Sequence, residues 1–150
     1  MRPFTTLRLI LGDQLNAAHS WFANKAPDIL YTLMEVRQET DYTRHHIQKI
    51  VAFFAAMRAF ARHLKNQGHA VAYVPLDDTD NHQCFEKNLV HLIEKHNISR
   101  FEYQLPDEYR LDQVFQKIAR TLPVSVSSSV TEHLLTHRHA VADFFKDKKQ

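Results

Sequence analysis

Short apolar runs alternate with longer amphipathic stretches along the whole chain. The runs contain aliphatic and aromatic residues with little polar alternation, which is typical of parallel strands covered on both faces. The stretches between them repeat their apolar positions every three or four residues, which indicates helices. We predict strands at residues 7–11, 29–34, 71–74, 99–103 and 124–126, and helices at residues 41–67, 83–96, 111–121 and 137–146.

This order of elements predicts the fold class. Strands that alternate with helices form an open parallel sheet with right-handed crossovers. We therefore expect an α/β fold, a Rossmann-like or flavodoxin-like open parallel five-stranded sheet with helices on both faces. One such domain accounts for residues 1–150, because a chain of 150 residues suits a single domain.

The longest predicted helix has an apolar face that is broader than contact with one sheet requires. Asp41 or Thr40 is a candidate N-cap, and Gly68 stands where a left-handed C-terminal cap belongs. Phe53 and Phe60 lie beside the main apolar stripe of this helix. We expect a ligand or another part of the protein to cover this flank.

Composition narrows the class of protein. Hydrophobic residues make up 44% and charged residues 24% of the chain, as in ordinary soluble domains. The single cysteine, Cys84, cannot form an intrachain disulfide, and no apolar run approaches the ~18 residues that a membrane span needs. We predict a cytoplasmic protein without membrane contact. A net charge of +2 is too small to argue nucleic-acid binding from charge alone.

Polar residues follow the first two predicted strands. In an open parallel sheet, ligands bind beyond the C-terminal ends of the strands, at the point where the strand order reverses, and the first strand usually lies at that point. A glycine there permits a tight turn and the close approach of a ligand to the backbone. The residues are Gly12, Asp13 and Gln14 after the first strand, and Glu35, Glu39 and Tyr42 after the second.

These groups suit a flat heterocycle with many N–H and C=O groups. They suit a phosphate poorly, because the loops are acidic and both the GxGxxG and GxxxxGK motifs are missing. An alternative is that Asp13 caps the next turn and that Glu35 and Glu39 are solvated. A further alternative is a small α/β enzyme in which Asp13 or Glu35 is a general base, although no nucleophile or metal is placed beside them.

His45 and His46, with Lys49, are candidates for a metal or acid–base site. Adjacent residues on a helix point about 100° apart, so both imidazoles cannot easily bind one ion. A packing or hydrogen-bonding role is therefore favoured. The serines at 127–129 lack the GxSxG elbow of a serine hydrolase. We predict no metal site and no catalytic residues in this chain.

Several motifs together resemble the photolyase/cryptochrome superfamily. LILGDQL at residues 9–15 resembles the opening of its photolyase-related branch, the iron–sulfur bacterial cryptochromes and prokaryotic (6-4) photolyases. The motifs HHxxKI at 45–50, AMRxFA at 56–61, GHAVAY at 68–73 and PDEYR at 106–110 resemble further segments of that branch, in the same order. The resemblance covers nearly the whole chain.

The resemblance implies an N-terminal antenna domain of a larger flavoprotein. Such a domain can hold a pigment, in this branch typically 6,7-dimethyl-8-ribityllumazine. A helical domain, in cis or in trans, holds FAD and a [4Fe–4S] cluster and repairs or senses damaged DNA, as a (6-4) photolyase (a lyase) or a cryptochrome. Carried onto this chain, the pigment site comprises Gly12, Asp13, Gln14, Met34, Glu35, Val36, Glu39, Tyr42, Ile50 and Phe53.

Phe53 departs from the family, which often has a smaller aliphatic residue at this position. A phenyl ring here could stack on the pigment or fill its space. Two functions therefore stay open. The chain could be an antenna domain that passes excitation energy to FAD, or an interaction module without a pocket that uses the apolar flank of the long helix for domain or subunit packing. The resemblance implies contact with DNA only through the parent protein, and the oligomeric state stays open.

Overall fold

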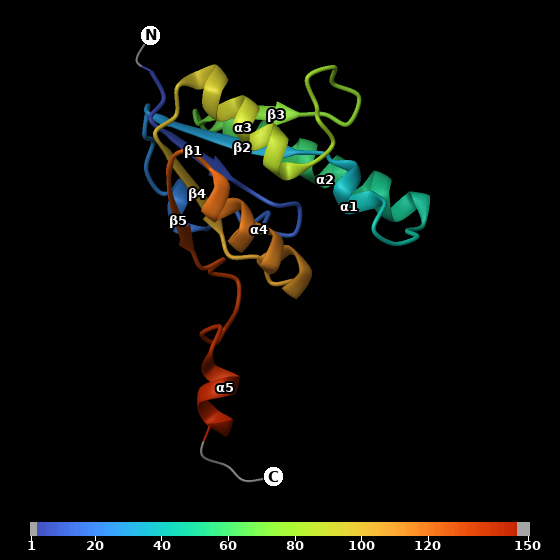
Figure 1. The fold of residues 1–150 in the computed structure, drawn as a ribbon, viewed down its shortest axis with the longest axis vertical. Coiled ribbons are helices and arrows are strands. Elements are labelled where there is room, and N and C mark those ends of the chain that lie inside the picture. The colour runs from blue at the N-terminus through green and yellow to red at the C-terminus, as the bar shows by residue number, and fades with distance from the viewer. Residues whose placement is uncertain (1–2, 147–150) are drawn as a thin grey trace.

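The computed structural model describes residues 3–146, in which strands and helices alternate (Figure 1). Residues 1–2 and 147–150 of the predicted domain lie outside the described part. The strands are β1 (Thr6–Leu9), β2 (Ile29–Met34), β3 (Ala70–Val74), β4 (Arg100–Gln104) and β5 (Ser125–Ser129). The helices are the 3₁₀ turn η1 (Ser20–Phe22), α1 (Arg37–Thr40), α2 (Ile47–Asn66), α3 (Phe85–His96), α4 (Tyr109–Thr121) and α5 (Ala140–Phe145).

The five strands form one sheet in the order β3-β2-β1-β4-β5, and all neighbouring strands are parallel. The predicted α/β class with an open parallel five-stranded sheet is confirmed. Its order is the one found in Rossmann folds, whereas flavodoxin-like sheets have the order 2-1-3-4-5. The direction of strand addition reverses between β1 and β4, so the switch point lies at β1, as the sequence predicts.

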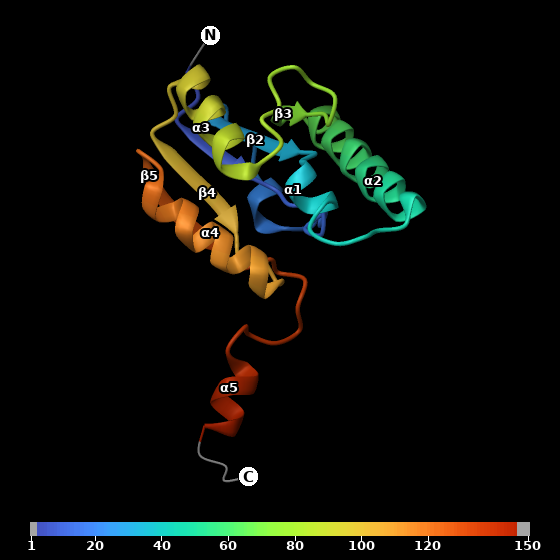
Figure 2. The same cartoon turned by 45° about the vertical axis from the view of Figure 1, so that its right-hand side comes forward.

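Helices cover both faces of the sheet (Figures 1 and 2). On one face α3 and α4 pack Leu89, Phe115 and Ile118 against Leu7 and Phe101 of the sheet. On the other face α2 and η1 bury a second cluster with the sheet, comprising Ile10, Trp21, Tyr31, Leu33, Phe54, Met57, Phe60, Ala61 and Leu64. Within residues 3–146, no helix combines the length and the apolar character needed to cross a bilayer.

The long helix begins later than the sequence predicts. His46 is extended, and its imidazole Nδ1 accepts a hydrogen bond from Gln48 N at 3.2 Å, so this side chain caps α2 in place of Asp41 or Thr40. A separate turn, α1, precedes it. The predicted left-handed cap at the C-terminal end of α2 is confirmed, because Gly68 has a φ of +87° directly after the helix.

The last helix is shorter than the predicted range of 137–146. Arg138 donates to Pro106 O at 2.7 Å and pairs with Asp112 at 3.3 Å, which fixes the backbone before α5. Glu132 lies further back, with a φ of +58°, and accepts from Ser20 N at 2.8 Å. The segment after β5 is thus held by polar contacts to η1, to the loop after β4 and to α4, and α5 projects away from the other elements (Figures 1 and 2).

An ion pair between the buried Glu35 carboxylate and the half-exposed Arg58 side chain fixes α2 against the end of the sheet. The Glu35 carboxylate is fully buried and accepts bonds from Arg58 Nε at 2.6 Å and Arg58 Nη2 at 2.8 Å. Tyr73 Oη donates to it at 2.5 Å and Leu76 N at 2.9 Å. Burial alone would raise the pKa of this carboxyl, but the donors outweigh burial and hold the pKa below its ordinary value. Glu35 therefore joins β2, β3 and α2.

Removing Arg58 would leave the buried Glu35 charge without its main partner. We expect Arg58→Met to lower the free energy of unfolding by about 3 kcal/mol at pH 7.5. Because the folded-state pKa of Glu35 is depressed, its contribution is present above the unfolded-state pKa and is lost as the pH falls below about 4. The difference between Arg58→Met and the wild type should therefore shrink in acid. Urea unfolding at several pH values measures both effects.

Arg62→Met is the matched control, since Arg62 is exposed one turn along the same helix and forms no ion pair within residues 3–146. We expect this change to cost less than about 0.5 kcal/mol. Equal losses in the two variants, or a loss in Arg58→Met that does not depend on pH, would contradict the structural role of the Glu35–Arg58 pair.

Candidate ligand-binding site

A cavity of about 160 Å³ lies at the C-terminal ends of β1 and β2, at the switch point of the sheet. Its side chains come from these strand ends, from α1 and α2, and from the beginnings of α3 and α4. Eight of the ten predicted site residues line it. They are Gly12, Asp13, Met34, Val36, Glu39, Tyr42, Ile50 and Phe53. The lining is completed by Ile10, Leu11, Thr40, His45, Lys49, Phe54, Met57, Phe85, Glu108 and Leu111.

Phe53 of α2 lies against Gly12 at the end of β1. A Cβ on Gly12 would stand 2.3 Å from Phe53 Cζ and 2.9 Å from Met57 Sδ, which is too close for any side chain. From the sequence, Gly12 is expected to admit a ligand to the backbone. The structure places a phenyl ring of the protein in that position, so Gly12 admits α2. The aromatic edge of Phe53 then forms one side of the cavity.

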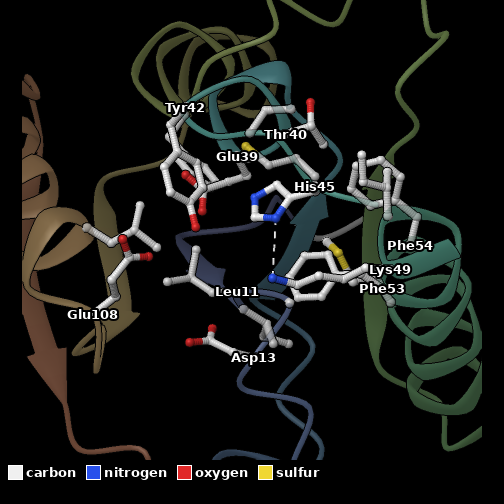
Figure 3. Close-up of a pocket in the computed structure, with 18 residues that line it drawn as sticks. Leu11, Asp13, Glu39, Thr40, Tyr42, His45, Lys49, Phe53, Phe54 and Glu108 are labelled. Atoms are coloured by element: carbon white, nitrogen blue, oxygen red, sulfur yellow. Dashed lines mark hydrogen bonds between the residues drawn. The ribbon is translucent and has the colours of Figure 1, made fainter. Parts of the chain in front are cut away.

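Carboxyl groups lie on the opposite side of the cavity, where Figure 3 shows Asp13 and Glu108 across from Lys49 and Phe53. Burial raises the pKa of the Asp13 carboxyl, although a bond to its own backbone opposes the rise. Burial likewise raises the pKa of Glu39, with Arg110 opposing and Glu108 adding to the rise. Each of these two carboxyls therefore stays protonated to a higher pH than it would in water.

Arg110 holds the upper edge of this acidic side in place. Its Nη2 donates to Glu39 Oε2 at 3.2 Å, and its Nε donates to Glu108 Oε1 at 2.8 Å. Its guanidinium carbon also stands 3.9 Å from the centre of the Tyr42 ring, a cation–π contact. Two carboxylates and an aromatic face thus share one cation, and Tyr42 is held at the edge of the cavity although half of its surface is exposed.

Lys49 and His45 supply donors on the side of α2. Lys49 Nζ lies 3.3 Å from His45 Nδ1, and the His45 ring packs edge-on to Tyr42 at 5.2 Å between centroids (Figure 3). Within residues 3–146, Lys49 forms no ion pair. Its ammonium is therefore available to an acceptor on a ligand. The expected hydrogen-bonding role of the His pair is found, since His46 caps α2 and His45 contacts Lys49.

Gln14 is a predicted site residue that lies outside the cavity. Its side chain is only 1% exposed. Its Oε1 accepts from Leu11 N at 3.1 Å, and its Nε2 donates to Gln104 O at 3.2 Å. The amide therefore fastens the turn after β1 to the end of β4, and its hydrogen-bonding capacity is used by backbone groups.

Glu35 is the other predicted site residue outside the cavity. Successive residues of a strand point to opposite faces, so Glu35 points away from Met34 and toward Arg58. Its carboxylate already accepts four hydrogen bonds, and the depressed pKa makes it a weak base. Glu35 is therefore excluded as the general base of a small α/β enzyme. Asp13 does line the cavity, whose described lining contains no Ser or Cys nucleophile.

Ten residues of the lining were outside the predicted site, among them Lys49, His45, Glu108 and Leu111. Glu108 and Leu111 follow β4, which neighbours β1 in the sheet. The predicted site rests on the loops after the first two strands, and the switch-point rule applied to the fourth strand would have included these residues. In residues 3–146, no cluster of three or more His, Cys, Asp and Glu is arranged to hold a metal ion.

Comparison with known proteins adds to this geometry. A family model described as "Deoxyribodipyrimidine photo-lyase-related protein" matches residues 8–150. The chain is also 34% identical over 122 residues to a (6-4) photolyase of Agrobacterium fabrum, an alignment that covers 80% of this chain and 24% of that protein. The chain thus spans about a quarter of this relative. From the match over nearly its whole length, the chain belongs to the deoxyribodipyrimidine photo-lyase-related protein family.

Proposed function

We propose that this chain is an antenna domain whose switch-point cavity binds a flat heterocyclic pigment, 6,7-dimethyl-8-ribityllumazine. The observation that carries the proposal is the distribution of groups in the cavity. Its lining combines apolar side chains such as Ile50 and Met34 with the carboxyls of Asp13 and Glu108, which lie across the cavity from Lys49 (Figure 3). A flat ring with N–H donors and C=O acceptors at its edges needs these groups, and family membership supports the choice of pigment.

The role of the pigment would be to pass excitation energy to FAD. In this proposal FAD and a [4Fe–4S] cluster belong to a helical domain, in cis or in trans, that acts on damaged DNA. The sequence of this chain contains one cysteine, so the cluster ligands would come from that domain. Residues 3–146 would contribute the cavity that orients the ring.

The donors and acceptors suggest one orientation of the ring. Lys49 Nζ would donate to a ring carbonyl, because it has no carboxylate partner within residues 3–146. The carboxyls of Asp13 and Glu39 would meet the ribityl hydroxyls or a ring N–H from the other side. Ile50 and Phe53 would contact the ring face, which binds by apolar burial and aromatic stacking.

The size of the cavity is the main constraint on this proposal. A volume of about 160 Å³ is below the range of about 300–1,000 Å³ that is usual for ligands of this size. Phe53 lines the cavity and lies against Gly12, so its ring takes up part of the space. We infer that the pigment enters as the Phe53 ring turns about its χ angles and stacks on the bicyclic ring.

The second candidate function is an interaction module without a pigment, and the same small cavity favours it. In that case Phe53 fills the space permanently. The exposed apolar residues Ile47 (65% exposed) and Val51 (59%) at the beginning of α2 would then pack on another domain or subunit. Light scattering that shows a strict monomer would argue against this candidate.

Titration of the chain with 6,7-dimethyl-8-ribityllumazine, followed by pigment fluorescence, tests the antenna proposal. We expect saturable binding at micromolar pigment, and about tenfold weaker binding in Lys49→Met, since one charge-assisted hydrogen bond is lost. Lys65→Met at the other end of α2 is the control and should bind like the wild type. Absence of binding by the wild type at tens of micromolar would rule out the proposal.

Replacing Phe53 with a smaller residue distinguishes a ring that stacks on the pigment from one that blocks its entry. If the phenyl ring limits access, Phe53→Leu should bind the pigment at least threefold more tightly than the wild type, because the cavity gains volume. Phe60→Leu removes the same atoms from a neighbouring part of α2 that does not line the cavity, and it should leave the affinity unchanged. Weaker binding in Phe53→Leu alone would show instead that the ring acts mainly as a stacking surface.

A further inference from the structure

The strand β5 forms one edge of the sheet, with α4 alongside (Figure 2). Among residues 3–146 it pairs only with β4. Ser125 N and Ser129 O form hydrogen bonds with the backbone of residues that flank β4, so these two residues direct their backbone groups toward β4. Because alternate residues of a strand direct these groups to opposite sides, the N–H and C=O groups of Val126 and Ser128 point to the outer edge.

This edge lacks the residues that usually keep edge strands apart. Natural proteins protect such edges with charged side chains, especially Lys, or with Pro. The sequence of β5 is SVSSS, which contains neither a charge nor a proline. The flanking Val124 and Val130 are also uncharged. A second strand can therefore approach β5 without meeting a like charge or a large side chain.

The opposite edge of the sheet, at β3, is protected by charge. A shallow groove beside β3 is lined by Arg62 and Lys65 of α2, together with Tyr73 and Pro75. Two copies of the chain that paired through β3 would bring these cations close together, and the proline after the strand cannot donate a ladder hydrogen bond. Pairing between two copies is therefore favoured at β5 over β3.

The helix beside β5 has a charge pattern that is complementary to itself. A shallow groove of about 290 Å³ lies between the two elements and is lined by Gln116, Ala119 and Arg120 of α4 and by residues 126–128 of β5. Asp112, Gln116 and Arg120 follow one another at intervals of four residues, so they lie along one face of the helix. If two such helices run antiparallel about Gln116, each Asp112 faces the Arg120 of the other.

The ionic groups on this face can form those contacts. Arg120 is exposed and has no carboxylate partner in the described part of the chain. Asp112 accepts from Gln116 Nε2 at 2.9 Å and pairs with Arg138 at 3.3 Å. A carboxylate has about four acceptor positions, so Asp112 can also accept from a further guanidinium. Gln116 and Ser127 line the same groove, so one twofold axis can pass near both.

We propose that two copies of this chain associate through antiparallel pairing of their β5 strands, which joins the two sheets into one. Val126 of each copy exchanges N–H···O=C bonds with Ser128 of the other, about a twofold axis at Ser127. The α4 helices lie antiparallel beside the axis, with Asp112 facing Arg120 on both sides. An extended peptide of another protein can also pair with an edge strand, but the order of acid, amide and base on α4 matches a second copy.

Sedimentation equilibrium of the full chain measures this association. We expect a monomer–dimer equilibrium with a micromolar Kd, as for small interfaces. Ser128→Pro should weaken the dimer at least tenfold, because each copy loses an outward N–H donor at an edge position where proline is tolerated. Ser128→Ala removes the same hydroxyl but keeps the N–H, so it should dimerise like the wild type. Circular dichroism and urea unfolding establish that each variant is folded.

Charge reversal on α4 tests the helix contact separately. Arg120→Glu places a carboxylate opposite each Asp112, so the dimer should weaken at least fivefold. Lys117→Glu makes the same change in net charge on an exposed residue of the same helix that lies outside the groove, and it should lose less than twofold. Equal weakening in the two variants would overturn the proposal, because it would reflect net charge alone.

Disulfide cross-linking tests the register of the paired strands. In the Cys84→Ala background, Ser127→Cys should form a covalent dimer on oxidation, because facing residues that are not hydrogen-bonded to each other have Cα atoms about 4.5 Å apart. Ser125→Cys should not, since it faces Ser129 of the other copy. Equal cross-linking at both positions, a strictly monomeric wild type at about 100 μM, or a dimer that Ser128→Pro leaves intact would each overturn the proposal.

Discussion

At the end of β1, Gly12 has no Cβ, and the space that a Cβ would need is occupied by the ring edge of Phe53 and the sulfur of Met57. This close approach sets the distance between α2 and the switch point of the sheet. A larger residue at Gly12 would push α2 outward and change both the core beneath the helix and the cavity beside it. The Glu35–Arg58 pair fixes the same helix to the residue that follows β2.

The position of α2 links the fold to the proposed function. Its inner face completes a core with Tyr31 and Leu33, and its N-terminal half supplies Lys49, Ile50 and Phe53 to the cavity. The cavity is therefore built on elements fixed by buried contacts, which suits a site that must orient a ring. The carboxyls opposite Lys49 are kept in place by Arg110, which itself is shared among Glu39, Glu108 and Tyr42.

The sequence predicted the sheet well, because continuous apolar runs such as 29–34 have few alternatives to a covered strand. It also predicted the location of the cavity, since the switch-point rule depends only on strand order. The prediction of site residues was wrong at two positions, where the direction of the side chain decides whether it reaches the cavity. Gln14 and Glu35 stand in loops that face a ligand in such folds, yet backbone groups and Arg58 take up their hydrogen bonds.

Other differences have similar local causes. Asp41 and Thr40 are better N-caps than His46 by residue type, but the imidazole of His46 forms the cap, so the helix begins at Ile47. Lys49 and His45 were considered as a metal or acid–base site and lie at the cavity instead. The family resemblance drew attention to the turn at 106–110, whose Glu108 and Arg110 border the cavity, but no periodicity or spacing in the sequence indicated that role.

The central claim is that a flat pigment occupies the switch-point cavity and contacts both α2 and the strand ends. Nuclear Overhauser effects between the ring methyl groups of bound 6,7-dimethyl-8-ribityllumazine and the methyl groups of the protein test it most directly. The account predicts contacts with Met34, Ile50 and Leu111, all of which line the cavity. Contacts confined to Leu134 and Leu135, which line a separate cleft after β5, would contradict it.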